Sequence, residues 1–220
     1  MLSALTRVLE PLASSHAPHL VIALWISAMA VLVLRDHRLA LLAFMAQRVV
    51  VAVLLLPTVG VPLVTTHAIS SIATVVMCLV GEWLLRRLTT TVTGGATASD
   101  QRAFWGPALR LTSGSLGLLL AYALLPRIGV AWLPPAVAQA AACLIISSVF
   151  MLLLAESPLR TGLAVLTFAD GARLIYALWQ PNPVAWGLWN VCDVCVALAA
   201  SMLRRHEVVR QRGTMVGEQA

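Results

Sequence analysis

Long apolar runs recur along almost the whole chain, and each is long enough to cross a membrane as a helix. A helix of about 20 residues covers about 30 Å of hydrocarbon, because each residue adds about 1.5 Å. Hydrophobic residues make up 60% of the 220 residues and charged residues only 11%. This composition has too few polar residues to cover the surface of a soluble domain. Seven runs are present, at 18–34, 39–56, 64–85, 108–125, 136–155, 158–179 and 183–203.

The sequence therefore predicts an all-α polytopic membrane protein, with about seven transmembrane helices in one bundle in the plasma membrane. Short breaks such as RDHR and QPNP separate several runs, so consecutive helices should lie antiparallel in the bilayer. Residues 18–203 would form the transmembrane domain. Residues 1–17 are expected to form an interfacial amphipathic helix or a frayed terminus, and 204–220 a polar cytoplasmic tail that is poorly ordered unless a partner holds it.

The arginines predict the orientation. All fifteen basic residues are arginine, and positive charge is enriched on cytoplasmic loops. With seven spans, ten arginines fall on one side and only Arg7 and Arg127 on the other, while three lie within or at the edge of spans. We therefore expect the N-terminus outside and the C-terminus in the cytoplasm. Because these loop arginines can face anionic lipid, the basic balance does not indicate nucleic-acid binding.

The chain lacks the sequence signatures of common catalytic and cofactor sites. It has no Gly-rich phosphate loop, no H-E-x-x-H, no G-x-S-x-G and no paired histidines suited to haem or metal. Cys192 and Cys195 flank Asp193 as C-x-x-C, but no second pair completes a zinc or iron–sulfur site, so helix packing is favoured over redox chemistry. We expect no catalytic activity, metal or cofactor in this chain alone.

Ionisable and polar side chains inside the apolar runs are the candidate functional residues. An aspartate at a helix centre costs about 2.5–3.5 kcal/mol even on mild insertion scales, so a retained charge usually pairs or lines a polar path. Arg48 lies near the middle of its run and needs an acid, and the simplest closure is an Arg48–Asp193 pair. The candidates for an ion or proton path are Asp193, Asp170, Arg173, Arg48, Asn190 and Gln47.

Spacing within single helices predicts further pairs. Asp170 and Arg173 are three residues apart and can neutralise each other, and Asn190 and Asp193 share a helix face at the same spacing.

Two ionisable residues of the run at 64–85 have simpler expected roles. Glu82 lies near the predicted cytoplasmic end and should pair with Arg86, four residues later. His67 lies near the outer end and is expected to be a hydrated interface residue rather than a proton carrier.

Three segments resemble the hydrogenase-4 component E family: RLALLAFMAQ, SVFMLLLAESPLRTGLAVLTFADG and VAWGLWNVCDVCVALAASMLRR. The resemblance covers nearly the whole chain. It implies a membrane subunit of a formate hydrogenlyase-type complex, with a fold like the small antiporter-like subunits of respiratory complex I and extra helices at the front. The implied partners are other membrane and peripheral subunits of a hydrogenase-like complex, which would carry the nickel, iron–sulfur and flavin chemistry.

The chain departs from the family pattern at the acidic positions. The family has Glu-Asn-Gly in the penultimate helix, whereas this chain has Ala169-Asp170-Gly171, so the acid is turned by about 100° around the helix. In the last helix Asp193 matches the family aspartate, but Gly187 stands at the glutamate position. A lysine expected in the third helix is replaced by an apolar residue near Val75. A proton-conducting subunit and a scaffold that no longer conducts are therefore both open.

The first functional hypothesis is a non-catalytic membrane subunit that assists proton or cation translocation coupled to electron transfer in its partners. One alternative is a stand-alone small transporter or permease, which is disfavoured because the sequence shows no internal repeat and no Gly/Pro-broken helices at corresponding positions of two halves. Another is a purely structural membrane anchor, for which both aspartates would be dispensable.

Overall fold

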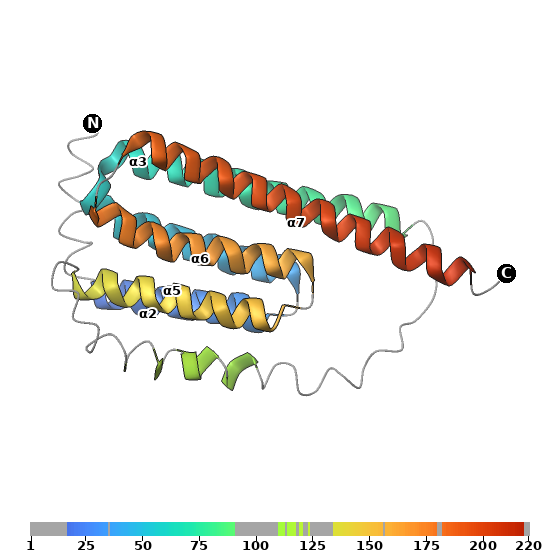
Figure 1. Ribbon diagram of the computed structural model, residues 1–220, viewed down its shortest axis with the longest axis horizontal. Helices are drawn as coiled ribbons and strands as arrows, with labels where there is room; N and C mark the ends of the chain where they lie inside the picture. Colours follow the sequence, from blue (N-terminus) through green and yellow to red (C-terminus); the bar gives the residue numbers. More distant parts are fainter. Residues whose placement is uncertain are drawn as a thin grey trace.

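The structure is a computed structural model that describes residues 17–34, 36–90, 110–112, 114–117, 119–120, 123, 134–155, 157–179 and 182–217. The long elements in these residues are all α-helices, as the composition predicts (Figure 1). They are α2 (Ala17–Val33), α3 (His37–Thr90), α5 (Pro135–Leu153), α6 (Pro158–Trp179) and α7 (Pro183–Gly217).

Four of the described helical stretches are long and apolar enough to cross a membrane: His37–Leu84, Pro135–Leu153, Pro158–Trp179 and Pro183–His206. Pro18–Val33 is a shorter apolar helix. The chain is accordingly a membrane protein by the length and composition of its helices.

Helix α3 is interrupted at Gly60 and folds back on itself. Straight, its 54 residues would extend about 80 Å, far more than about 30 Å of hydrocarbon. Gly60 has φ 77° and ψ 167°, a conformation reserved for glycine, and Pro57 and Pro62 flank it without backbone N–H groups for the helical ladder. The first half (37–59) and the second half (61–90) therefore lie side by side (Figure 1). They contain the predicted spans 39–56 and 64–85.

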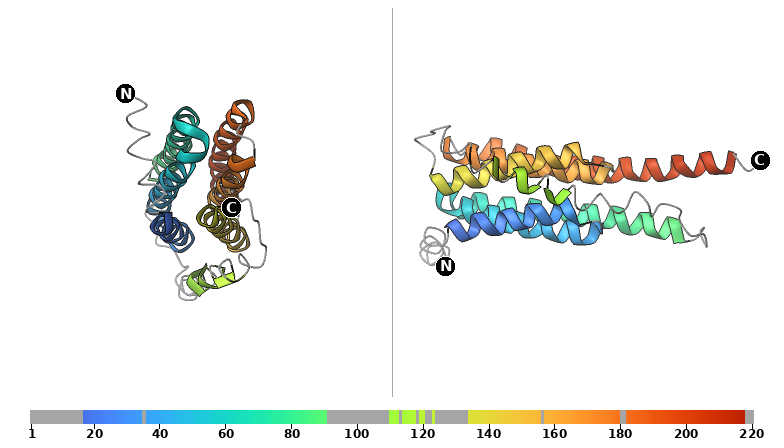
Figure 2. Two further views of the ribbon diagram at one scale, coloured as in Figure 1. Left: turned by 90° about the vertical axis from the view of Figure 1, so that its left-hand side faces the viewer. Right: turned by 90° about the horizontal axis from the view of Figure 1, so that it is seen from below.

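The helices form two layers (Figure 2). One layer contains α2 and the two halves of α3, and the other contains α5, α6 and α7. Neighbours within a layer are antiparallel, whereas helices that face each other across the layers run in the same direction (Figure 1). Four hydrogen bonds between the layers reflect this arrangement, because they join residues at similar separations: 120 for Gln47–Thr167 and Ser70–Asn190, 123 for Leu63–Trp186 and 126 for Leu34–Arg160.

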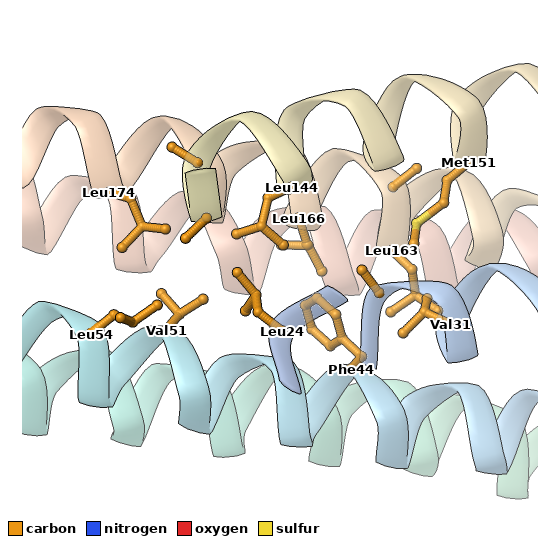
Figure 3. Packing of buried hydrophobic residues seen from close by; sticks show 14 of the residues in the cluster. Leu24, Val31, Phe44, Val51, Leu54, Leu144, Met151, Leu163, Leu166 and Leu174 are labelled. Carbon is orange, nitrogen blue, oxygen red and sulfur yellow. The ribbon is translucent and has the colours of Figure 1, made fainter. Parts of the chain in front are cut away.

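The apolar core lies between the layers (Figure 3). Leu24, Phe44 and Val51 from the first layer meet Leu144 and Leu166 from the second, and all are buried. Helices in lipid gain little from hydrophobic burial alone and associate by close packing, often at small residues. A Cβ placed on Gly162 would lie 2.5 Å from Ala200 Cβ, which shows how closely α6 approaches α7.

Some predicted segments fall outside the described residues. These are the N-terminal segment at 1–16 and eight of the eighteen residues of the fourth span at 108–125. The count of seven spans and the orientation therefore remain predictions.

The C-terminal segment differs from expectation. Helix α7 continues to Gly217, well beyond the predicted span end at residue 203, so the backbone of 204–217 is helical rather than poorly ordered. The reason is local. Arginine, glutamate and glutamine are good helix formers, and no glycine or proline follows Pro183 and Gly187 until Gly213.

Candidate functional site

Two arginines and two aspartates meet in the interior of the bundle and form a closed ring of ion pairs. We call Arg48, Asp170, Arg173 and Asp193 the charge cluster. Arg48 Nε lies 2.9 Å from Asp170 Oδ2, and Arg48 Nη1 lies 2.6 Å from Asp193 Oδ2. Arg173 Nη1 lies 3.1 Å from Asp170 Oδ1, and Arg173 Nη2 lies 2.8 Å from Asp193 Oδ2. Each arginine thus contacts both carboxylates.

The charge cluster is buried and electrically neutral. None of its four side chains is more than 2% exposed. An unpaired ion in a low-dielectric interior carries a desolvation penalty of several kcal/mol, which good pairing geometry can offset. Two positive and two negative groups alternate around the ring, so the four buried charges neutralise one another. Their ion pairs also connect helices that are far apart in sequence.

Three helices supply the charge cluster. Arg48 comes from the first half of α3, Asp170 and Arg173 from successive turns of α6, and Asp193 from α7. Gly171 allows α6 to approach α5 closely beside the charge cluster. A Cβ on Gly171 would lie 2.9 Å from Ile145 Cγ1 and 3.0 Å from the Ala141 carbonyl oxygen of α5.

Aromatic rings pack on both guanidinium groups. The Arg48 guanidinium carbon lies 5.0 Å from the centroid of the Phe44 ring, and that of Arg173 lies 5.3 Å from the Trp189 ring. Tyr176 stacks on Trp189 with ring centroids 5.9 Å apart. These distances are within the range of cation–π attraction, which adds to the ion pairs in holding the arginines.

His67 belongs to this site, which corrects the expectation of a hydrated interface residue. Its side chain is fully buried, and Nδ1 lies 3.2 Å from Arg173 Nη1. Arginine can only donate, so Nδ1 accepts and a neutral ring carries its proton on Nε2. Trp186 of α7 lies edge-on to the His67 ring and donates from its indole N–H to the Leu63 carbonyl oxygen at 3.0 Å. The Trp186 side chain, from another helix, therefore covers His67, although His67 lies near the end of its own apolar run.

Polar side chains flank the charge cluster. Ser70 Oγ lies 3.1 Å from Asn190 Oδ1, and Gln47 Nε2 donates to Thr167 Oγ1 at 3.4 Å. Asn190 and Gln47, both predicted candidates, thus lie beside the cluster without entering an ion pair with it in the described residues. Arg48 Nη1 also donates to Ser71 Oγ at 3.4 Å.

The predicted ion pairs are confirmed and extended. Arg48 pairs with Asp193, and Asp170 pairs with Arg173, as expected. The sequence reasoning treated them as two separate pairs and missed the ring that joins them, as well as the roles of His67 and Ser71. A signal for the latter was present: polar residues recur at helical spacing in the second half of α3, at His67, Ser70, Ser71 and Thr74.

Glu82 has a partner on another helix that its sequence spacing did not indicate. Its Oε1 lies 2.7 Å from Arg204 Nη1 of α7. The two residues are 122 positions apart in sequence, which matches the register of the two layers. The expected partner, Arg86, has its side chain outside the described residues, so that pair remains a prediction.

His67, Asp170 and Asp193 could in principle be considered as metal ligands. Each offers one ligand atom, and these atoms lie within 4.8 Å of one another. Both carboxylates, however, already contact two arginines, and His67 Nδ1 faces Arg173, one of those two arginines. A divalent cation would therefore add two positive charges to a neutral cluster. The geometry favours ion pairing over metal binding.

Comparison of the chain with models of protein families, with characterised proteins and with solved structures finds no match.

Proposed function

We propose that this chain is a non-catalytic membrane subunit of a hydrogenase-like complex in the plasma membrane, and that its charge cluster takes part in proton or cation movement coupled to electron transfer in partner subunits. The observation that carries the proposal is the buried ring of Arg48, Asp170, Arg173 and Asp193. Ionisable residues retained in a membrane interior commonly mark ion pathways or proton relays.

The family resemblance supports the identity of the complex. Two of the three segments that resemble hydrogenase-4 component E contain Asp170 and Asp193, and the third ends at Gln47, immediately before Arg48. The charge cluster thus assembles the same parts of the chain that carry the resemblance. The nickel and iron–sulfur chemistry would belong to partner subunits.

The ring provides a simple way to couple protonation to structure. A proton delivered to Asp170 or Asp193 removes one negative charge and leaves two arginines sharing a single carboxylate. The cluster then carries a net positive charge in the interior, which is unfavourable until an arginine moves or another anion compensates. Proton arrival would therefore displace α3 relative to α6 and α7, because these helices supply the charges.

Purification tests the identity of the complex. The chain carrying an affinity tag would be isolated from its native membrane in mild detergent and its partners identified by mass spectrometry. We expect hydrogenase-like subunits to co-purify in fixed stoichiometry, together with hydrogen-dependent electron transfer. Isolation of the chain without such subunits, under conditions that keep other membrane complexes intact, would contradict the proposal.

A stand-alone transporter is the second candidate, and one observation favours it. The charge cluster joins Arg48 of one layer to Asp170 and Asp193 of the other. Secondary transporters likewise hold ions and substrates near the membrane midplane between their structural halves. Ion flux in proteoliposomes that contain this chain alone would support this function, and flux only with the co-purified partners would support the first.

A further inference from the structure

Buried polar atoms without a protein partner lie just beside the charge cluster. Thr74 Oγ1 and Gln47 Oε1 have no hydrogen-bond partner among the described residues. The contrast with neighbouring hydroxyls is clear, because Ser70, Ser71 and Thr167 each donate to a carbonyl oxygen of their own helix. A buried polar atom left unpaired is energetically costly, and buried water is the usual partner of such an atom.

Thr74 begins a stripe that leads away from the charge cluster to one end of the bundle. Thr74, Cys78 and Glu82 are spaced by four residues and share one face of the second half of α3. All three are buried, and Glu82 has the largest exposed fraction, 7% of the whole residue. On α7, small side chains Ala197 and Ala200 occupy the corresponding levels below Asp193. The stripe combines a hydroxyl, a thiol and a carboxylate in a wall that is otherwise apolar.

The stripe reaches the surface at the Glu82–Arg204 pair. The Arg204 side chain is 19% exposed, whereas Glu82 behind it is 8% exposed. The residues from Ser71, at the level of the cluster, to Glu82 cover about 16 Å along the helix. The pair therefore stands between the outside and a buried stripe that ends at the charge cluster.

The opposite end is closed by an aromatic side chain. Trp186 is 1% exposed, packs edge-on against His67, and is fixed by its hydrogen bond to the Leu63 carbonyl oxygen. Just beyond Leu63, α3 turns back at Gly60. A fixed indole at this level blocks a continuous polar route between His67 and that end.

We propose that water and protons reach the charge cluster from one end only, past the Glu82–Arg204 pair and along Thr74 and Cys78. Glu82 accepts a proton from water at the surface and passes it to water beside Cys78 and Thr74, and the final acceptor is the carboxylate of Asp193 or Asp170. No oxidant or cofactor is required, since each step moves one proton between oxygen atoms. The inference deepens the proposed function by assigning the access route to the same site.

The native thiol of Cys78 tests the route. In a Cys143→Ser/Cys192→Ser/Cys195→Ser background, Cys78 is the remaining cysteine of the chain. Right-side-out and inverted membrane vesicles would be treated with a charged, membrane-impermeant methanethiosulfonate. We expect modification of Cys78 only from the face that carries Glu82 and Arg204, because a charged reagent needs a hydrated path.

Two variants sharpen the test. Arg204→Gln should speed the modification of Cys78 severalfold, because it removes the partly exposed pair at the entrance. The matched control is Val76→Cys combined with Cys78→Ser in the same background. Val76 is an exposed, lipid-facing residue of the same helix. A cysteine there should stay unmodified from both faces.

The outcomes separate this inference from the function of the complex. Cys78 that is unreactive from both faces, or equally reactive from both, would overturn the one-ended route. The labelling uses the chain in its native membrane and needs no hydrogenase turnover, so it succeeds or fails independently of the purification experiment. Glu82→Gln adds a functional readout: it should slow proton uptake without reducing the modification of Cys78, because it removes the proton acceptor and also breaks the pair at the entrance.

Discussion

Arg48 Nη1 lies 2.6 Å from Asp193 Oδ2, although 145 residues separate them in the sequence. The contact joins the second predicted span to the last one. Because Asp193 also binds Arg173, and Arg48 also binds Asp170, neither residue of the pair can be changed alone without altering the charge balance of four residues.

Removing one charge should destabilise the protein, and removing an opposite charge as well should restore part of the loss. Breaking one partner of a buried ion pair typically costs about 3–5 kcal/mol. We expect Asp193→Asn and Arg48→Gln each to lower the thermal midpoint of the detergent-solubilised protein. The cluster of the double variant is again neutral. Its loss of stability should be smaller than the sum of the two single losses by about 0.5–3 kcal/mol. Strictly additive losses would contradict a coupled cluster.

Asp170 and Asp193 should be equally important for proton uptake, because each carboxylate contacts both arginines. We expect Asp170→Asn and Asp193→Asn to reduce uptake to a similar extent in proteoliposomes that hold the whole complex, with hydrogenase turnover assayed in parallel. Asp36→Asn, at an exposed position in the α2–α3 turn, is the control and should leave uptake unchanged. Wild-type uptake in the Asp170→Asn/Asp193→Asn double variant would leave the chain as a scaffold.

The close approach of α6 and α7 should make Gly162 intolerant of even one methyl group. A Cβ there would lie 2.5 Å from Ala200 Cβ, and overpacking of this kind costs about 1–3 kcal/mol. We expect Gly162→Ala to lower the thermal midpoint and Ala200→Gly to rescue it. Gly187→Ala is the matched control, because no heavy atom lies within 4 Å of its added Cβ. A loss of stability at Gly187 as large as that at Gly162 would argue against the packing explanation.

Cysteine labelling should place the α2–α3 turn and the C-terminus on one side of the membrane and the α6–α7 turn on the other. The α2–α3 turn and the C-terminal end of α7 lie at the same end of the bundle (Figure 1). Single cysteines at Asp36, Asn182 and the C-terminus, in a chain without its native cysteines, would be labelled from each face of sealed vesicles. The arginine distribution predicts that Asp36 and the C-terminus are cytoplasmic. An external C-terminus would overturn the orientation, and labelling of Asp36 and the C-terminus from opposite faces would overturn the arrangement.

The helices and the central ion pair could be predicted because each depends on local or simple electrostatic rules. Apolar runs long enough to span hydrocarbon indicate the helices, and a lone charge at mid-depth requires a partner. Spacing alone identified the Asp170–Arg173 pair. Which faces the helices turn towards one another depends on packing between distant segments, so the closure of the two pairs into one ring could not be predicted.

Glu82 and His67 show what local reasoning misses. The i+4 spacing predicts Arg86 as a partner of Glu82 but gives no sign of Arg204, which the parallel register of the two layers brings to the level of Glu82. His67 was judged by its distance from the end of its own apolar run. Its burial comes from Trp186, a residue 119 positions later in the chain, and only the layered arrangement makes that contact visible.

The charge cluster has a consequence for biosynthesis. Arg48 is translated well before Asp170 and 145 residues before Asp193. At about 5–20 residues per second, the nascent chain contains an arginine in its second apolar run for roughly 7–30 s before the last of its acidic partners has been made. Until Asp170 is made, Arg48 has neither aspartate beside it, and until Asp193 is made the ring is incomplete. The early helices must therefore wait at the interface, draw water into the membrane, or rely on the insertion machinery. Completion of the ring would then be the event that commits the first half of the protein to its final depth in the membrane.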